Sequence, residues 1–358
     1  MHLDELRRLL RVGPVMAQAH VLTPVALEPG VRIEPRADLV AAELDSSAPG
    51  AVEPVLIQEI EPRWANRFAI WQGPGLPAAD ELDRHLPERL DYVRGAVVSQ
   101  ARVAEEFARR FLAGRHHCGV LLLVDGLSYL ECADWPEAPA PCFVDGPSTT
   151  EFGFLQIVQA SGLVARLIGA GRYQLRAFSY WERTRNELTA RLFAGVPLTS
   201  VRHFPEVLAH LQGESLLGQF IFVIREGLDE LAHRQRELPQ SVRRAAVRAA
   251  HEDLEALVEL VRGRGRRALV ALLADHGVAW RDDRQWRVVG SWEQSWHGRY
   301  SERPPTTPGL ATALGGATPP VYCYHPGLLC REPRSNEAGF HGGLSAEESF
   351  VPFVVVDL

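Results

Sequence analysis

Three short apolar runs organise the chain, at residues 119–126, 218–225 and 267–277. Each consists largely of Val, Leu, Ile, Phe or Ala, without the alternation of a strand that has one face in water. Such unbroken runs are typical of parallel strands that are buried on both faces. The pattern therefore predicts an α/β fold with a mostly parallel central sheet flanked by helices.

Side chains of metal-ligand type follow each of these runs. Asp125 ends the first, Asp275 and His276 end the last, and Asp229 and His233 follow the middle one. Ligands of open α/β sheets bind at the carboxyl ends of the strands. Asp229 and His233 are four residues apart, so one helical face presents both. An isolated pair of this kind is usually an ordinary surface pair. Here side chains of metal-ligand type follow all three apolar runs, and that repetition favours a metal site.

A group of hydroxyl residues lies between the first and second apolar runs, just before a helical pattern. Pro147-Ser-Thr-Thr150 leads into a helical pattern over 154–167. This order is typical of a helix N-terminus, where backbone N–H groups attract phosphate and a hydroxyl can attack it. Standing alone, the segment would be an ordinary helix cap.

The remaining segments divide the chain into two predicted regions. Residues 1–115 are expected to form a mainly helical N-terminal region of unknown role, and 116–358 the catalytic domain. Segments at about 176–216 and 281–335 read as cap-like insertions. The adjacent His116 and His117 do not predict a metal site, because neighbours on a strand point to opposite faces.

Composition narrows the possible functions. The net charge is −7 and no apolar run approaches the length of a membrane span, so we expect a cytoplasmic protein that acts without a membrane. Five cysteines without a C-x-x-C pair predict buried, reduced thiols. All 38 basic residues are arginine, which excludes a Schiff-base or P-loop lysine. The acidic charge favours short or single-stranded over duplex nucleic acid.

The order of these motifs resembles the alkaline phosphatase superfamily, and most closely its PglZ branch. The resemblance covers about 119–356, and its last motif is His341-Gly-Gly-Leu-Ser-Ala-Glu-Glu348. It implies that Thr150 is the nucleophile, with Thr149 as the alternative if the register slips by one. A covalent phosphothreonine that water then hydrolyses follows from this role.

The resemblance also implies two divalent metal ions, in a domain with an insertion before the last metal-binding histidine. Carboxylate and imidazole ligands suit Zn²⁺ best, with Mn²⁺ as the alternative. One ion would be held by Asp229, His233 and His341. The other would be held by Asp125, Asp275 and His276.

PglZ domains are associated with phage exclusion and with phosphodiester cleavage. The resemblance thus implies a phosphodiesterase or nuclease acting on nucleotide phosphodiesters, in a BREX-like bacterial defence system with other defence proteins as partners. The alternatives are a phosphomonoesterase of the same superfamily and a non-catalytic scaffold in a defence complex. The complete ligand set disfavours the scaffold. Cyclic dinucleotides, oligonucleotides, DNA and monoesters all stay open as substrates.

Overall fold

The computed structural model describes residues 97–358 except 115, 181–189, 265–266, 292–294, 296 and 315–319, together with scattered positions before 97. The chain divides into two compact units, Met1–Val98 and Ser99–Leu358. In the first, the described strands β1 (Arg32–Ile33) and β2 (Ala42–Glu43) form an antiparallel pair. The predicted helical N-terminal region lies largely outside the described residues and stays a prediction.

A seven-stranded sheet forms the centre of the second unit. Its strand order is β4-β16-β8-β3-β7-β5-β6. The five strands from β8 to β6 run parallel, while β16 runs antiparallel to both of its neighbours. The strands are β3 (Cys118–Val124), β4 (Ala140–Phe143), β5 (Gln174–Ser179), β6 (Leu198–Ser200), β7 (Gln219–Arg225), β8 (Ala268–Ala274) and β16 (Phe350–Asp357).

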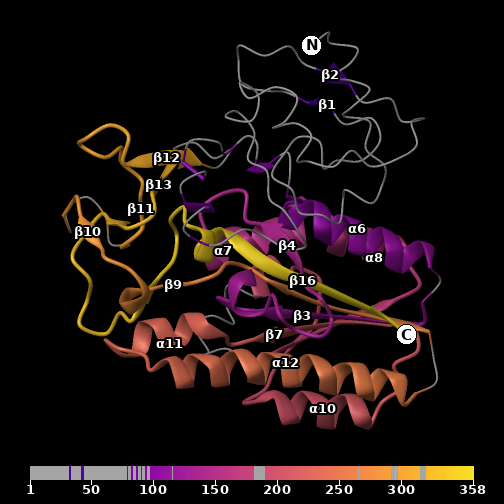
Figure 1. Cartoon of the computed structure of the whole chain (residues 1–358). Coiled ribbons are helices and arrows are strands. Elements are labelled where there is room, and N and C mark those ends of the chain that lie inside the picture. Colours follow the sequence, from indigo (N-terminus) through magenta and orange to yellow (C-terminus); the bar gives the residue numbers. More distant parts are fainter. Residues whose placement is uncertain are drawn as a thin grey trace, which may run out of the picture. The chain divides into compact units, whose positions relative to one another are not determined.

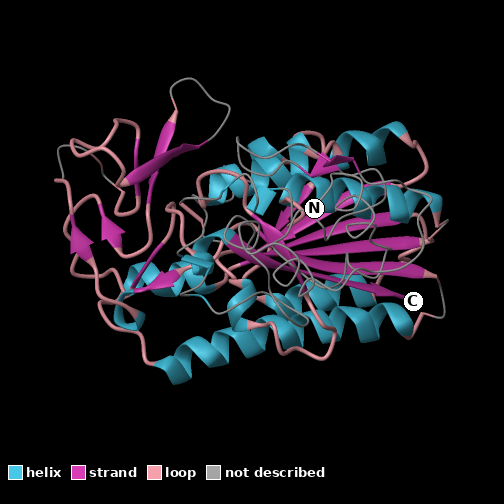
Figure 2. Ribbon diagram, turned by 45° about the horizontal axis from the view of Figure 1, so that its top comes forward, coloured by secondary structure: helices cyan, strands magenta, loops and turns pink. Residues whose placement is uncertain are grey.

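Helices cover both faces of this sheet (Figures 1 and 2). Helices α6 (Gln100–Ala113) and α8 (Leu163–Gly169) lie on one face. The opposite face carries α10 (Phe204–Gln212), α11 (Leu228–Arg234) and α12 (Gln240–Arg262). The predicted α/β class, with a mostly parallel sheet between helices, is confirmed.

The buried strands account for the continuous apolar runs of the sequence. Every residue of β3, β7 and β8 is buried, because each strand has helices on both sides and strands at both edges. Phe107 and Phe111 of α6 meet Phe220 of β7 edge-on, with ring centroids 5.9 and 5.0 Å apart. Edge-on aromatic pairs of this kind add to the apolar burial that holds helix and sheet together.

The segment between β8 and β16 forms small strands beside the carboxyl end of the sheet (Figure 2). β11 (Tyr300–Ser301), β13 (Val321–Tyr324) and β12 (Ala311–Leu314) form one sheet, and β10 (Arg287–Val288) pairs with β14 (Leu328–Leu329). The predicted insertion at 281–335 contains these strands. The predicted insertion at 176–216 includes most of β5, all of β6 and α10, which belong to the main sheet and its helical layer.

One helical stretch, residues 150–169, is long and apolar enough to suit a membrane span by length and composition. It consists of α7 (Thr150–Phe154), a π-helical turn η3 (Leu155–Ala160) and α8, and Gly162 interrupts it at φ +67°. Its buried residues Phe154, Ile157 and Leu167 pack into the core beside the sheet. The core therefore accounts for its apolar side.

All five cysteines are buried and free, as the sequence predicts. Burial raises the pKa of the Cys118 thiol to about 12, and raises the pKa of Cys142 well above its usual value. Thiols of this kind form little thiolate and are chemically inert.

Candidate active site

The ends of β3 and β8 bring the first three predicted ligands together. The strands are paired so that Val124 lies opposite Ala274, and the next residues are Asp125 and Asp275. Nε2 of His276 lies 3.6 Å from Oδ1 of Asp125 and 3.6 Å from Oδ2 of Asp275. All three side chains are fully buried, and we call them the inner cluster.

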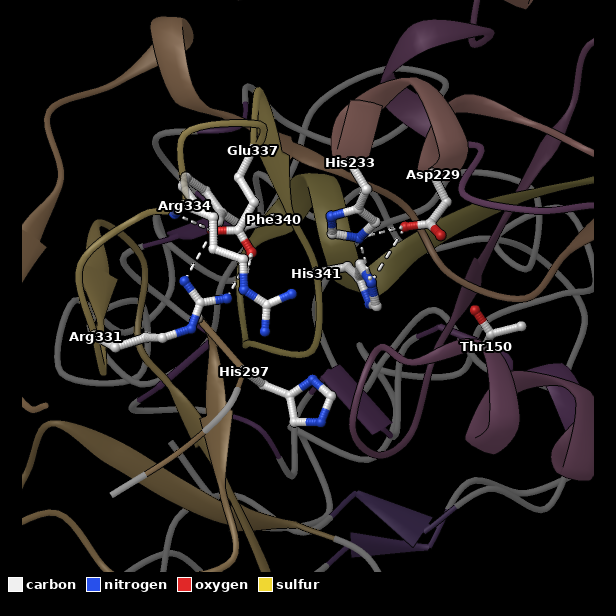
Figure 3. A pocket seen from close by; sticks show the side chains of 10 residues that line it. Thr150, Asp229, His233, His297, Arg331, Arg334, Glu337, Phe340 and His341 are labelled. Atoms are coloured by element: carbon white, nitrogen blue, oxygen red, sulfur yellow. Dashed lines mark hydrogen bonds and ion pairs between the residues drawn. The ribbon is translucent and has the colours of Figure 1, made fainter. Parts of the chain in front are cut away.

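A second group of ligands, the outer cluster, consists of Asp229, His233 and His341 (Figure 3). Asp229 and His233 lie one turn apart on α11. His341 follows β15 (Gly339–Phe340), which pairs with β9 (Ala279–Trp280) and so returns the chain to the end of β8. Oδ1 of Asp229 lies 3.2 Å from Nε2 of each histidine, and the two Nε2 atoms are 3.1 Å apart.

The two clusters adjoin one another. The ring of His276 stacks on that of His341, with centroids 4.3 Å apart. Donor atoms of Asp229, His276 and His341 also lie within 4.8 Å of one another, as do those of the inner cluster. His276 therefore belongs to two groups of donor atoms, each of which could hold an ion.

Backbone carbonyls set the tautomers of two histidines. Nδ1 of His276 lies 3.0 Å from the carbonyl oxygen of Gly277, and Nδ1 of His341 lies 3.1 Å from that of Ser148. Because a carbonyl oxygen only accepts, each Nδ1 carries the hydrogen and each Nε2 turns a lone pair toward the clusters. This is the arrangement of metal-ligating histidines.

The pKa values of the site's carboxyl groups are consistent with cation binding. Burial is the largest influence on the pKa of Asp229 and would raise it, but His341 and His233 together hold it well below its usual value. Burial raises the pKa of Asp275 to about 7, against the backbone N–H of Gly126, which donates to Oδ1 at 3.0 Å. Oδ2 of Asp275 accepts no hydrogen bond from the described residues. Buried carboxylates crowded beside imidazole nitrogens fit divalent cations.

Thr150 is the first residue of α7, and its hydroxyl lies beside His276 of the inner cluster. Its Oγ1 atom is 3.1 Å from Nε2 of His276. The preceding Thr149 is the helix cap, and its side-chain oxygen accepts from the backbone N–H of Phe152 at 3.4 Å. Thr149 is thus occupied with capping, which favours Thr150 between the two candidate hydroxyls.

Helix α7 approaches the inner cluster closely because Gly153 has no side chain. A Cβ atom there would lie 2.2 Å from the carbonyl oxygen of Asp275, closer than real Cβ atoms come. From α6, the buried Gln100 donates to the carbonyl oxygens of Ala274 and Asp275 at 2.8 and 2.6 Å. Both contacts fix the end of β8 relative to Thr150.

Ser148 joins the Thr150 segment to the outer cluster, and the motif order did not single it out. Its hydroxyl donates to the carbonyl oxygen of Gly343 at 2.9 Å and accepts from the N–H of Gly342 at 3.0 Å. Its own carbonyl accepts from His341, as described above. The only sign of this role in the sequence was the position of Ser148 between Pro147 and Thr149, next to the proposed nucleophile.

A buried ion pair holds the segment that follows His341 in place. Arg299 donates to Glu348 through Nε at 3.1 Å and through a terminal nitrogen at 2.6 Å, and both side chains are fully buried. Glu348 also accepts from the N–H of Gly343 at 2.9 Å. Glu348 lies in the Ser-Ala-Glu-Glu motif, whereas nothing in the sequence pattern links it to Arg299.

The outer cluster opens into a cavity of about 280 Å³ (Figure 3). Thr150 and the outer cluster line one side of it. The other lining residues are His297, Gly298, Arg331, Arg334, Glu337 and Phe340. All seven sequence-predicted site residues therefore gather at the carboxyl edge of the sheet, next to a cavity, while their chemical roles stay predictions.

Comparison with known proteins adds only a loose likeness of fold. No family model and no curated protein sequence matches the chain. Murine ectonucleotide pyrophosphatase/phosphodiesterase 5 is 11% identical with a TM-score of 0.43, over 66% of this chain and 87% of that one. The periplasmic domain of phosphoethanolamine transferase EptC from Campylobacter jejuni is 8% identical with a TM-score of 0.37, over 68% and 80%.

A third match, the human ectonucleotide pyrophosphatase/phosphodiesterase 5, is 10% identical with a TM-score of 0.43, over 66% of this chain and 87% of that one. These similar structures are alkaline phosphatase superfamily members, a group of phosphoester-acting enzymes. Likenesses this loose assign no activity, so a functional assignment depends on the residues of the site.

Proposed function

We propose that this chain is a two-metal phosphodiesterase that acts on nucleotide phosphodiesters with Thr150 as nucleophile. The observation that carries the proposal is the position of Oγ1 of Thr150, 3.1 Å from His276, where the inner and outer clusters adjoin. A site that only held metal for structure would have no use for a hydroxyl at this position.

The inner cluster would hold one divalent ion and the outer cluster the other. When bound, such ions neutralise the phosphoryl oxygens and the departing oxygen. Zn²⁺ suits the carboxylate and imidazole donors best, and Mn²⁺ is the alternative.

The chain's own residues supply the nucleophile and its orientation. Oγ of Thr150 attacks phosphorus, the bond from phosphorus to the leaving-group oxygen breaks, and a phosphothreonine and an alcohol result. Nε2 of His276 lies 3.1 Å from Oγ1 of Thr150, but its lone pair would hold the inner ion. The hydroxyl hydrogen of Thr150 therefore passes to solvent, and solvent protonates the departing oxygen. Water then cleaves the phosphothreonine, which releases a phosphomonoester and restores the hydroxyl.

The PglZ resemblance supports a diester rather than a monoester and a role in phage defence. On that basis we propose a cytoplasmic protein of a BREX-like system, with nucleotides or short nucleic acids as substrates and other defence proteins as partners. A phage-plating assay tests this setting. Thr150→Ala should abolish protection by the complete system, and protection that persists with Thr150→Ala would favour a scaffold.

Metal content and substrate preference test the activity. The purified protein should bind about two divalent ions per chain. It should turn over bis-p-nitrophenyl phosphate faster than p-nitrophenyl phosphate, and a strong preference for the latter would indicate a phosphomonoesterase. Extending the comparison to oligonucleotides and cyclic dinucleotides identifies the substrate. Absence of zinc or manganese, with no activity on adding either, would contradict the two-metal reading.

A further inference from the structure

The side of the cavity opposite the clusters is built on a buried ion pair. Arg331 is 2% exposed and donates to both carboxylate oxygens of Glu337, at 2.8 and 2.5 Å. Glu337 also accepts from the backbone N–H of Arg334 at 2.7 Å. These bonds close residues 331–337 into a compact loop, which we call the arginine loop.

The arginine loop is attached to the helix that carries the outer cluster. The side-chain amide of Asn336 donates to the carbonyl oxygen of His233 at 2.6 Å. The N–H of Ala338 donates to the carbonyl oxygen of Ala232 at 2.8 Å. The loop is therefore held in a fixed position relative to Asp229 and His233, as a binding surface for the same substrate requires.

Arg334 is the accessible arginine of this loop. Its side chain is 32% exposed, and its guanidinium points into the cavity (Figure 3). Its Nε atom forms a long ion pair with Glu337 at 3.9 Å, while Arg331 binds that carboxylate through two hydrogen bonds. Arg331 therefore makes the hydrogen-bonded contact to Glu337, and the more exposed Arg334 lines the cavity in which a substrate would lie.

In Figure 3 the outer cluster lies between Arg334 and Thr150. A phosphoryl group attacked by Thr150 lies at the clusters, so Arg334 faces the part of the substrate beyond them. Guanidinium groups bind phosphate through two parallel hydrogen bonds. The geometry points to Arg334 as the binding residue for a second phosphate of the substrate, beyond the scissile one, with Arg331 and Glu337 as its positioning pair. This inference rests on the proposed phosphodiesterase function.

Two chromogenic diesters that differ by one phosphate test this assignment. They are the p-nitrophenyl ester of thymidine 5′-phosphate and the same compound with a 3′-phosphate. The metal-loaded wild type should prefer the 3′-phosphorylated compound in kcat/KM. Arg334→Ala should lower kcat/KM for that compound by roughly 10- to 100-fold, mainly through KM, and by less than about threefold for the other.

Matched variants separate binding from folding. Arg334→Lys keeps the charge but not the paired donors, so it should recover part of the preference. Arg303→Ala removes an exposed arginine of the same insertion that does not line the cavity, and should leave both substrates unaffected. Equal losses on both substrates, or no loss with Arg334→Ala, would overturn the assignment.

A binding measurement keeps this inference distinct from the proposed function. Titration calorimetry on metal-loaded Thr150→Ala compares adenosine 3′,5′-bisphosphate with adenosine 5′-monophosphate. Tighter binding of the bisphosphate that is lost on adding Arg334→Ala supports the second-phosphate site, even if neither diester is hydrolysed. Equal binding of the two nucleotides would reject the site even if the protein proves to be a phosphodiesterase.

Discussion

The inner and outer clusters use the same donor types but are built in different ways. Asp125, Asp275 and His276 follow two adjacent parallel strands and are fully buried. In the outer cluster only Asp229 is comparably buried, while the side chains of His233 and His341 are 35% and 16% exposed. The inner cluster depends on the sheet, whereas the outer cluster depends on a short helix and on a segment that returns after an insertion.

Because of this difference, the inner cluster is the more rigid of the two and the outer cluster is the one that a substrate can reach. An ion in the inner cluster would be enclosed by contacts from α6, α7 and the residues that follow β3, so its geometry is fixed by the core. An ion in the outer cluster would face the cavity and the arginine loop, where substrate enters. We therefore expect the inner cluster to hold its ion more firmly and the outer cluster to exchange its ion first.

The largest effect is expected where the clusters meet. Thr150→Ala should lower turnover by ~10³-fold or more with both ions retained, because neither cluster uses its oxygen as a required ligand. Thr150→Ser should keep partial activity. Thr149→Ala should cost about 1 kcal/mol of stability through the lost cap but leave turnover largely intact. Inactive Thr149→Ala with active Thr150→Ala would shift the nucleophile by one residue.

Next in size is the ion pair behind the outer cluster. Glu348→Ala leaves Arg299 buried without its carboxylate, so the free energy of unfolding should fall by about 3–5 kcal/mol in urea titrations. The matched control is Glu106→Ala, which breaks an exposed pair with Arg109 and should change stability little. Similar losses in the two variants would show that the buried pair has no special role.

Graded removal of metal compares the clusters directly. Asp275→Asn and His233→Ala should each leave about one ion per chain, with affinity at the altered site lower by ~100-fold or more. Under increasing chelator, elemental analysis of the wild type should show one ion leaving well before the other. His233→Ala should abolish the early loss and Asp275→Asn the late one. Simultaneous release of both ions would remove the distinction between the clusters.

The smallest effect concerns Glu131, in the short 3₁₀ helix Tyr129–Glu131 that follows β3. Its side chain is 17% exposed, and burial raises its pKa to about 7 although Arg243 and Trp280 oppose the shift. A raised carboxyl pKa means that the folded state binds the proton more tightly, so stability declines as pH rises from 4.5 toward 7.

Glu131→Gln should remove this decline, which we expect to be on the order of 1 kcal/mol between pH 5 and pH 8 in urea titrations. The exposed Glu259→Gln is the control. If Glu131→Gln and the wild type respond equally to pH, the carboxyl titrates as it does in the unfolded chain.

Sequence reasoning succeeded where local pattern and structure coincide. β3, β7 and β8 were predictable because a strand buried on both faces must be apolar throughout. Asp125, Asp275 and His276 followed, since they directly succeed those strands. The registers that place them side by side came from the structure.

Contacts between distant residues were not predictable in this way. Arg299 and Glu348 are 49 positions apart, and Gln100 reaches a carbonyl 175 positions away. An arginine in a chain with 38 basic residues, all arginine, carries no sign of whether its side chain will be buried like that of Arg331 or partly exposed like that of Arg334. The difference between Arg331 and Arg334 becomes visible only in the folded arginine loop.

The burial of all five thiols has a practical consequence. A maleimide nitroxide would find no accessible native thiol, so a single introduced cysteine could be spin-labelled without removing Cys118, Cys142 or the others. Arg334→Cys would place the label on the far side of the cavity from Thr150. With Mn²⁺ as the bound ion, paramagnetic broadening of the nitroxide signal would then report how close the arginine loop lies to the bound ions, in a protein that need not turn over any substrate.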